Sequence, residues 1–258
     1  MAVQWLKTGK ESAAAAKQEE AAAKQRKEEQ GKMWRFFMKQ DEEDVRITFV
    51  DGDLSDEGYL MPPRFYEHNV QMNGKYGNLF VCPEKTDPAS GEKCPLCEQG
   101  DPASLVALFT IIDHRPFTRK DGSIGQDTPK ILAAKPITFQ LLNTLAVKRK
   151  GLAGCTFDVM RTGDKSAAVG SMFDFVEKHN ITPEFKAQFV REYKDAKTGK
   201  TVTVQGFEPA NYEAEIVYRT ADELRTQYGF GKGLTSGSSP MGSKPSPAGT
   251  KPDYEQHL

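Results

Sequence analysis

The cysteine and histidine pattern between positions 68 and 97 constrains the fold of this 258-residue chain more than any other feature. Cys94-Pro-Leu-Cys97 has the two-residue spacing that lets two thiolates bind one metal ion from a tight turn. Cys82 and His68 can complete a tetrahedron. Because four protein ligands leave no open coordination position, the pattern predicts one structural zinc ion and not a catalytic metal.

Two other interpretations of the cysteines are open at this point. A disulfide framework fits poorly, because no apolar signal peptide opens the sequence and four cysteines in 258 residues are sparse for such a scaffold. Cys155 competes with His68 for the fourth ligand position, although its strand-like surroundings are ordinary for a free buried thiol.

Charge is distributed unevenly along a chain whose totals nearly cancel, at 35 Lys and Arg against 36 Asp and Glu. Residues 41–60 carry eight acids against one Arg, whereas residues 112–165 carry ten bases against five acids. The basic central segment predicts a local surface for an anionic ligand. No run of 18 apolar residues occurs, so we expect no membrane span and a reducing, cytoplasmic compartment.

The two ends of the chain differ in composition from its middle. Residues 10–30 consist of strong helix formers without a large apolar side chain, which predicts that residues 1–31 form a projecting charged helical arm. The arm is either an inert spacer or a means of presenting Trp5, Leu6 and Lys7 to another protomer or protein. Residues 231–258 are rich in Gly, Ser and Pro and predict a flexible tail, which either recruits other proteins or is a simple tail.

Residues 32–165 have the pattern of a β-rich domain. Asn73-Gly74 predicts a hairpin turn, and Gly151 is expected to end a helix over residues 138–150. The expected strands cover residues 45–50, 65–70, 76–81, 104–112, 130–137 and 155–161. We therefore predict a mainly β fold with added helices (α+β), an OB-fold-like partly open barrel with an inserted zinc subdomain at about residues 66–100.

Residues 166–230 predict a helical/β accessory subdomain. Met172–His179 and Pro183–Tyr193 have helical spacing, and a further short helix is expected over Ala221–Tyr228. An extended segment is expected at residues 201–204.

Interleaved aromatic and basic residues predict a surface for single-stranded nucleic acid. Such binding needs positive charge for the phosphates and exposed rings on which bases stack. For any one ring the alternative is core packing, which we assign to Phe109, Phe139 and Phe157, and for any one cation it is a solvated face. The candidates are Trp34, Arg35, Lys75, Tyr76, Arg115, Phe117, Arg119, Lys120, Lys135, Lys148, Arg149, Lys150 and Arg161.

Over residues 34–165 the chain resembles the helix-destabilising single-stranded DNA-binding proteins of T4-type phages. The resemblance rests on a His, a lone Cys about a dozen residues on, a later Cys-Pro-x-Cys, the Asn73-Gly74 hairpin and the apolar strand that follows. It implies an OB-fold core with an integral zinc subdomain, and single-stranded DNA binding in phage replication, recombination or repair within the bacterial host cell. It also implies self-association through the N-terminal segment and partner recruitment through the C-terminal tail.

The chain departs from this family at both ends, since its N-terminus is an Ala/Glu/Lys arm and its C-terminus lacks a long acidic block. The expected function is non-enzymatic, sequence-independent binding of single-stranded DNA. One alternative is a zinc-stabilised transcription or replication accessory factor that binds a polymerase. Another is a metal-dependent nuclease that uses Asp51 and Asp53.

Overall fold

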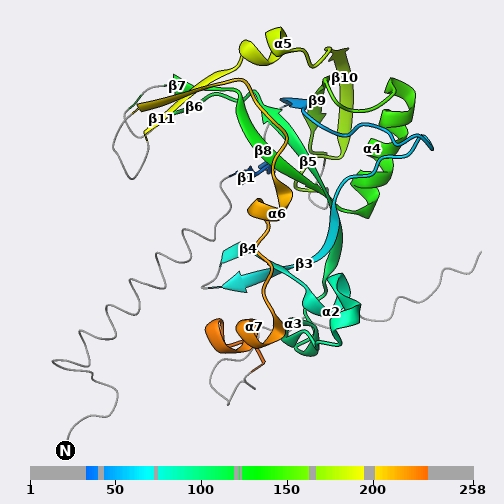
Figure 1. The fold of residues 1–258 in the computed structure, drawn as a ribbon, viewed down its shortest axis with the longest axis vertical. Helices are drawn as coiled ribbons and strands as arrows, with labels where there is room; N and C mark the ends of the chain where they lie inside the picture. Colours follow the sequence, from blue (N-terminus) through cyan, green and yellow to red (C-terminus); the bar gives the residue numbers. More distant parts are fainter. Residues whose placement is uncertain are drawn as a thin grey trace, which may run out of the picture.

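The computed structural model describes residues 33–39, 44–72, 75–118, 122, 124–162, 167–194 and 201–231. The side chains of residues 75–77, 190–194, 201, 202 and 204 lie outside this description. The predicted arm at 1–31 and nearly all of the predicted tail at 231–258 also lie outside the described residues. What is described is a mixed α+β fold, mostly sheet with some helices, as predicted (Figure 1).

Among the described residues, eight strands form one sheet with the order β1-β8-β5-β2-β9-β10, and the β3-β4 hairpin is attached to β5. The strands are β1 (Trp34–Arg35), β2 (Val45–Phe49), β3 (Arg64–Met72), β4 (Lys75–Val81), β5 (Ser104–Asp113), β8 (Thr128–Ala134), β9 (Cys155–Met160) and β10 (Met172–Lys178). The path is open, and no closed barrel forms within the described ranges. At the gap, the Met38 backbone N–H donates to the carbonyl of Ala168 at 2.7 Å.

Strand β5 joins the main sheet to the β3-β4 hairpin. Its C-terminal half pairs with β2, its N-terminal half pairs with β3, and β8 runs antiparallel along the other edge. This ten-residue strand is mostly buried on both faces, which explains why its sequence is apolar without alternation. The predicted hairpin around Asn73-Gly74 agrees with the antiparallel β3-β4 pairing, although the two turn residues themselves lie outside the description.

Helix α4 (Pro136–Arg149) is the longest described helix and packs on the main sheet. Proline at its first position shortens the strand that was predicted over residues 130–137, because Pro136 begins the helix. The left-handed turn that ends the helix starts at Lys150, with φ 55°, one residue before the Gly151 at which the sequence predicted the stop. Gly151 then donates its N–H to the Ala146 carbonyl at 2.9 Å.

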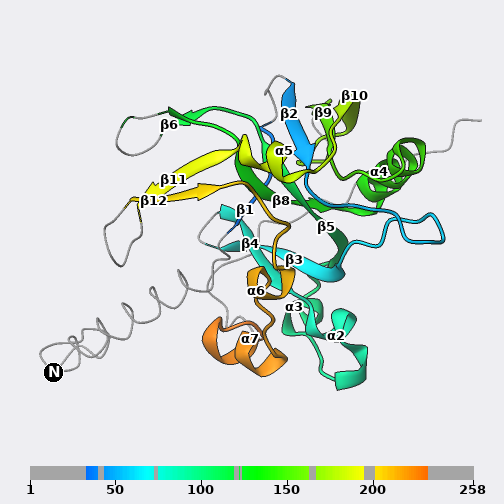
Figure 2. The same cartoon turned by 45° about the horizontal axis from the view of Figure 1, so that its top comes forward.

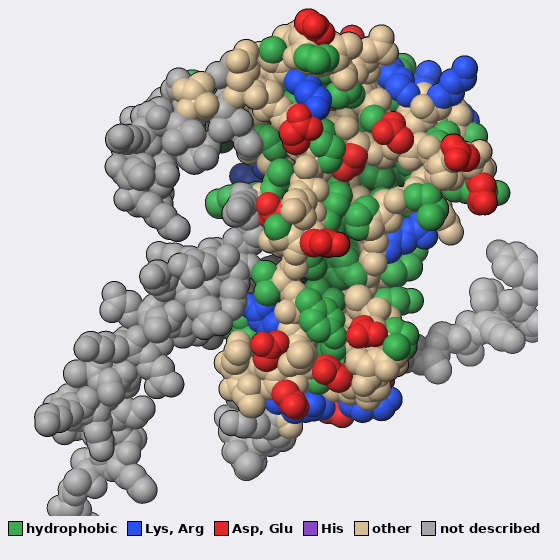
Figure 3. All heavy atoms as spheres, viewed as in Figure 1, with side chains coloured by type: hydrophobic (Ala, Val, Ile, Leu, Met, Phe, Trp, Pro, Cys, Tyr) green, Lys and Arg blue, Asp and Glu red, His purple; other side chains and the backbone are tan. Residues whose placement is uncertain are grey.

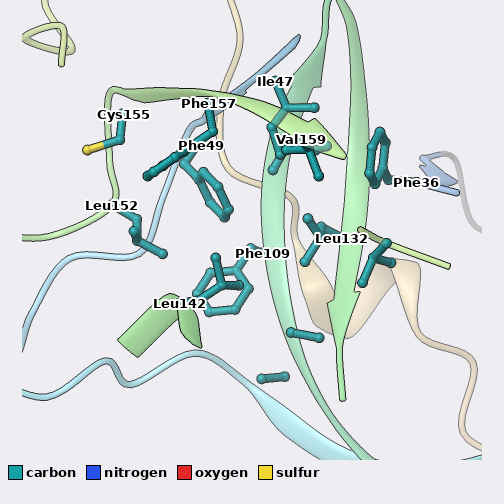
Figure 4. Close-up of a cluster of buried hydrophobic side chains, with 14 of the residues drawn as sticks. Phe36, Ile47, Phe49, Phe109, Leu132, Leu142, Leu152, Cys155, Phe157 and Val159 are labelled. Atoms are coloured by element: carbon teal, nitrogen blue, oxygen red, sulfur yellow. The ribbon is translucent and has the colours of Figure 1, made fainter. Parts of the chain in front are cut away.

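The main hydrophobic core lies between the strands and α4 (Figure 4). Phe49 stands at its centre, with edge-to-face contacts to Phe109 and Phe157 at ring-centroid distances of 5.8 and 5.7 Å. Both of those partners are fully buried, as predicted. Phe139 is only partly buried, and the Arg64 guanidinium lies 4.0 Å from the centre of its ring.

One predicted helix is wrong, and another is helical only in its first half. Residues 172–178 form strand β10, because Phe173 and Phe175 alternate toward the core with a period of two. In the segment 183–193 only α5 (Pro183–Ala187) is helical, and the chain then enters β11 (Val190–Lys194), which pairs with β12 (Thr201–Gln205). Because β10 pairs with β9, the main sheet extends beyond residue 165, and the predicted division into domains stays a prediction.

A segment that we call the strap, residues 206–217, runs across the outer face of β5 and β8 (Figure 1). It contains α6 (Tyr212–Glu215) and leads to α7 (Ala221–Gln227), which was predicted correctly. Phe207 packs against Ile112, and Ile216 packs with the cluster around Ile131. The outer face of these two central strands is therefore covered by the chain itself.

The small elements lie at two ends of the molecule. Near the β3-β4 hairpin are α2 (Pro83–Thr86), the 3-10 turn η1 (Pro88–Ser90) and α3 (Pro95–Glu98). Two hairpins, one formed by β6 (Phe117–Thr118) and β7 (Ile124–Gly125) and the other by β11 and β12, project from the same side of the molecule in both views (Figures 1 and 2). None of the described helices has the length and hydrophobicity that crossing a bilayer requires.

Candidate functional site

Four side chains from the β3-β4 hairpin and the loop that follows it converge on one point. The ligand atoms of His68, Cys82, Cys94 and Cys97 all lie within 4.8 Å of one another. Nε2 of His68 is 3.4 Å from Sγ of Cys94 and 3.6 Å from Sγ of Cys97, and the sulfurs of Cys82 and Cys97 are 3.6 Å apart. Three of the four residues are buried and Cys97 is partly buried.

These separations fit a tetrahedral ion. Zinc bonds of about 2.3 Å to sulfur and about 2.0 Å to nitrogen place neighbouring ligand atoms about 3.5 to 3.8 Å apart. Within the described part of the chain, this is the one group of His, Cys and acidic residues arranged to hold a metal ion. The cluster can therefore bind a metal, and its donor set is consistent with zinc.

Local structure places each ligand. His68 lies on β3, where the β5 partner strand fixes the hairpin, and Cys82 follows β4 immediately before Pro83 begins α2. Cys94 similarly precedes Pro95, the first residue of α3, and Cys97 lies one turn along that helix. Each proline suits the first turn of a helix, so the two Cys-Pro steps fix the points at which loop becomes helix.

A second layer of contacts orients the ligands. Nδ1 of His68 donates to Oδ2 of Asp101 at 2.7 Å, which leaves Nε2 with a lone pair directed at the sulfurs. The Glu84 carboxylate accepts the backbone N–H of Cys94 at 3.0 Å. Asp101 and Glu84 were not predicted from the sequence, because a carboxylate has no spacing rule that marks it as a partner of a ligand.

The three thiols affect one another's protonation. Burial, with the neighbouring Cys82 next in size, raises the pKa of Cys97 to about 12, and burial also raises the pKa of Cys82. Burial alone would raise the pKa of Cys94 as well, but hydrogen bonds from His68 and from the backbone of Cys97 outweigh it and lower that pKa. A bound cation is what would allow all three sulfurs to be thiolates together.

Cys155 does not compete for the site. It is fully buried in the main core beside Leu152 and Phe157 (Figure 4), and its Sγ donates to the carbonyl of Gly151 at 3.5 Å. The alternative in which it replaces His68 is therefore wrong.

Exposed aromatic side chains and two cations, some of them predicted and some not, lie on or beside β1, β6 and β8. We call this the rim surface and define it by Trp34, Phe37, Arg115, Phe117 and Lys130. Trp34 is 78% exposed, Phe37 51% and Phe117 43%. Trp34 is the register partner of Lys130 in the parallel β1-β8 pair, and Nη2 of Arg115 donates to the carbonyl of Phe37 at 3.1 Å.

A buried carboxylate links the two cations of the rim surface. Asp113 is 1% exposed and accepts from Nη2 of Arg115 and from Nζ of Lys130, both at 2.6 Å. Burial alone would raise the pKa of Asp113, but the hydrogen bonds from Arg115 and Lys130 more than offset this and lower it. Arg115 and Lys130 thus share this one carboxylate.

The other predicted contacts that the structure describes lie on other elements or have partners within the fold. Arg35 is mostly buried and is paired with Glu67, its Nη2 lying 3.1 Å from Oε2 of the carboxylate, and Arg161 donates to the carbonyl of Met38 at 2.9 Å. Lys135 is exposed just before α4. Arg149 lies against the ring of Phe175 at 3.6 Å.

Lys148, Arg149 and Lys150 stand at the end of α4, across the molecule from β1 (Figures 1 and 2). Arg119 and Lys120, and the side chains of Lys75 and Tyr76, lie outside the described residues.

Phe37 and Lys130 were not among the predicted contacts. Phe37 lies in an aromatic run in which Phe36 is buried, so only the observed burial distinguishes the exposed ring from the core ring. Lys130 was assigned to strand 130–137, and its pairing with Asp113 is a non-local contact that the sequence does not indicate.

Asp51, half of the carboxylate pair that suggested a nuclease, is bonded within the fold. Its Oδ1 accepts from the Thr110 backbone N–H at 3.0 Å and its Oδ2 accepts from the Tyr212 hydroxyl at 2.5 Å. Burial, the largest effect, raises the pKa of Asp51, and hydrogen bonds from Tyr212 and Thr110 oppose that effect only in part. The Asp51 and Asp53 pair therefore does not offer two open carboxylates to a metal ion.

Comparison of the chain with models of protein families, with curated proteins and with solved structures found no match. On the face that Figure 3 shows, basic side chains lie singly or in small groups among acidic ones. That face shows no continuous row of basic side chains along which a nucleic-acid backbone could lie. The rim surface is therefore the better candidate for binding nucleic acid.

Proposed function

We propose that this protein binds single-stranded DNA without sequence preference, through the rim surface, and is not an enzyme. The observation that carries the proposal is the grouping of three exposed rings with two cations at the place where two hairpins project. Exposed rings can stack on bases without giving up contacts in the hydrophobic core. Every base has a face that can stack on such a ring, whatever the sequence. Arg115 and Lys130 supply the basic side chains that contacts with phosphates need.

We assign the metal of the His68 cluster as structural zinc. The donor set of three thiols and one imidazole, the separations of 3.4 to 3.6 Å and the Asp101 contact support this assignment. All four positions are filled by protein, so the ion would hold α2, α3 and the hairpin together and would not act on a substrate.

We also propose that the core is OB-like. The strand order β8-β5-β2-β9-β10, with α4 between β8 and β9, supports a five-stranded Greek-key arrangement, and β1 with the following residues lies across the gap between β8 and β10. An OB-like core would agree with the resemblance to T4-type phage proteins, for which we propose a role in protecting single strands during replication, recombination or repair.

The experiment that tests the function replaces rings of the rim surface. W34A and F117A should each weaken binding to oligo-dT by about 1–3 kcal/mol, the measured range for one base–ring stack. Fluorescence polarisation of a labelled oligonucleotide gives the affinities. Y59A is the matched control, since Tyr59 is 58% exposed in the loop between β2 and β3. Equal affinities for wild type, W34A and F117A would remove the rim surface from the proposal.

A further inference from the structure

The strand that carries Trp34 is held from both sides by acidic residues of other elements. β1 has only two residues and pairs only with β8 among the described strands. Before Trp34, the Met33 backbone N–H donates to Oε2 of Glu215 at 2.8 Å. After it, Arg35 donates to Glu67 of β3 at 3.1 Å. So short a strand has few ladder hydrogen bonds of its own, which makes these two contacts important to its position.

Glu215 is itself fixed, because the strap around it is tightly bonded to the sheet. The hydroxyl of Tyr212 donates to Asp51 and lies 2.8 Å from Oγ1 of Thr110, which also accepts the Ala210 backbone N–H at 2.9 Å. Ile216 packs against the buried Val106, Leu108 and Ile131. The Glu215 carboxylate therefore reaches Met33 from an anchored helix.

Arg35 has no other fixed partner for its charge within the described part of the chain. Its Nη1 is buried and has no hydrogen-bond partner, so Glu67 is the contact that holds the guanidinium. With Arg35 turned inward to Glu67, the neighbouring Trp34 side chain is left 78% exposed.

We infer that Glu215 is a positioning residue for single-strand binding: it holds Met33 so that the Trp34 ring is presented at a fixed place. This deepens the proposed function and rests on it. A carboxylate near a DNA-binding ring should also repel phosphates, so the charge of Glu215 by itself would weaken binding. Positioning and repulsion therefore predict opposite effects of the same substitutions.

Two substitutions of Glu215 distinguish the effect of its side-chain length from the effect of its negative charge. E215D keeps the negative charge but shortens the side chain, so it should weaken oligo-dT binding about fivefold, the loss expected for one hydrogen bond. E215Q loses the charge but keeps an oxygen that can accept from Met33, so its affinity should stay close to that of wild type. E213Q on the same helix, at an exposed position, is the control for removing one charge.

A second readout follows the ring itself. The chain has two tryptophans, so a Trp5→Phe background leaves Trp34 as the sole source of indole fluorescence. Time-resolved anisotropy should show a more mobile indole in E215D and an unchanged one in E215Q. Tighter binding by E215Q together with wild-type behaviour of E215D in both measurements would overturn the inference and leave the proposed function standing. If wild type does not bind oligo-dT, the proposed function fails, and the anisotropy of E215D alone decides the positioning role.

Discussion

At the scale of single residues, contacts just outside the candidate metal ligands orient those ligands. Asp101 holds Nδ1 of His68 at 2.7 Å and so determines which ring nitrogen faces the sulfurs. Such partners typically change metal affinity by about 10- to 100-fold when they are removed.

We therefore expect D101A to lower zinc affinity by about 10- to 100-fold while the four ligands stay in place. Competition with a chromophoric chelator measures the change. D87A is the control, because Asp87 is exposed in the same loop region. Identical affinities for D101A and D87A would show that the His68 contact does not orient the ligand.

Asp51 gives a pH-dependent prediction. Its pKa is raised in the fold, mainly by burial, so the charged form destabilises the native state above that raised pKa. As pH falls through the raised value toward the unfolded value of about 3.9, protonation removes the penalty. D51N lacks the penalty at every pH and keeps an oxygen for the Thr110 N–H.

Thermal unfolding from pH 8 to pH 4 should thus show D51N to be the more stable protein at neutral pH, with the difference shrinking as pH falls. E57Q, at an exposed position, controls for losing one negative charge. A difference that is constant with pH, or that grows on acidification, would contradict the account.

At the scale of elements, the β9-β10 pair depends on a close backbone approach. Gly154 has φ +80°, and its carbonyl accepts the His179 N–H at 2.9 Å. A Cβ at this position would lie 1.9 Å from the carbonyl oxygen of His179. Gly58 also has φ +80°, but a Cβ there would meet nothing within 4 Å.

The two glycines form a matched pair for mutation. G58A should lower the free energy of unfolding by about 1–2 kcal/mol, the cost of a left-handed non-glycine residue. G154A carries the same cost and a further loss of about 1–3 kcal/mol from the forced backbone shift. Urea unfolding of both variants checks this, and equal losses would mean that the β9-β10 end can open without cost.

Secondary structure was predictable where periodicity was long and unambiguous. The strand at 104–112 was predicted because its apolar run is long and unbroken. The helix at 138–150 was predicted because its apolar spacing continues over more than two turns. Residues 172–178 were misassigned, since short segments with aromatic residues fit both periods and only pairing with β9 decides between them.

The two candidate sites also differ in how far local sequence patterns could predict them. The Cys and His spacing is local, so all four residues of the candidate metal cluster could be named from the sequence, whereas Asp101 and Glu84 could not. For the rim surface, Trp34 and Phe117 could be predicted as exposed candidates from the sequence. The pairing of Arg35 with Glu67 could not be predicted. That pairing depends on how β1 lies against β3, which no local pattern encodes.

At the scale of the whole molecule, two halves are joined through β5. The main sheet carries the rim surface. The β3-β4 hairpin and the loop after it carry the cluster that could hold a metal ion. The strap leads from the sheet to α7, which packs beside Cys82 and Cys94. The strap covers the outer face of β5 and β8. A single strand of DNA bound in the way we propose would therefore lie over the rim surface and not over that face.

The most direct test of the central claim is a titration of the full chain, in the Trp5→Phe background, with oligo-dT and with duplex of equal length at two salt concentrations. The account predicts that the single strand changes Trp34 fluorescence, binds more weakly at higher salt because counterion release contributes to affinity, and is preferred over duplex. Absence of binding to the single strand, or equal affinity for duplex, would contradict it.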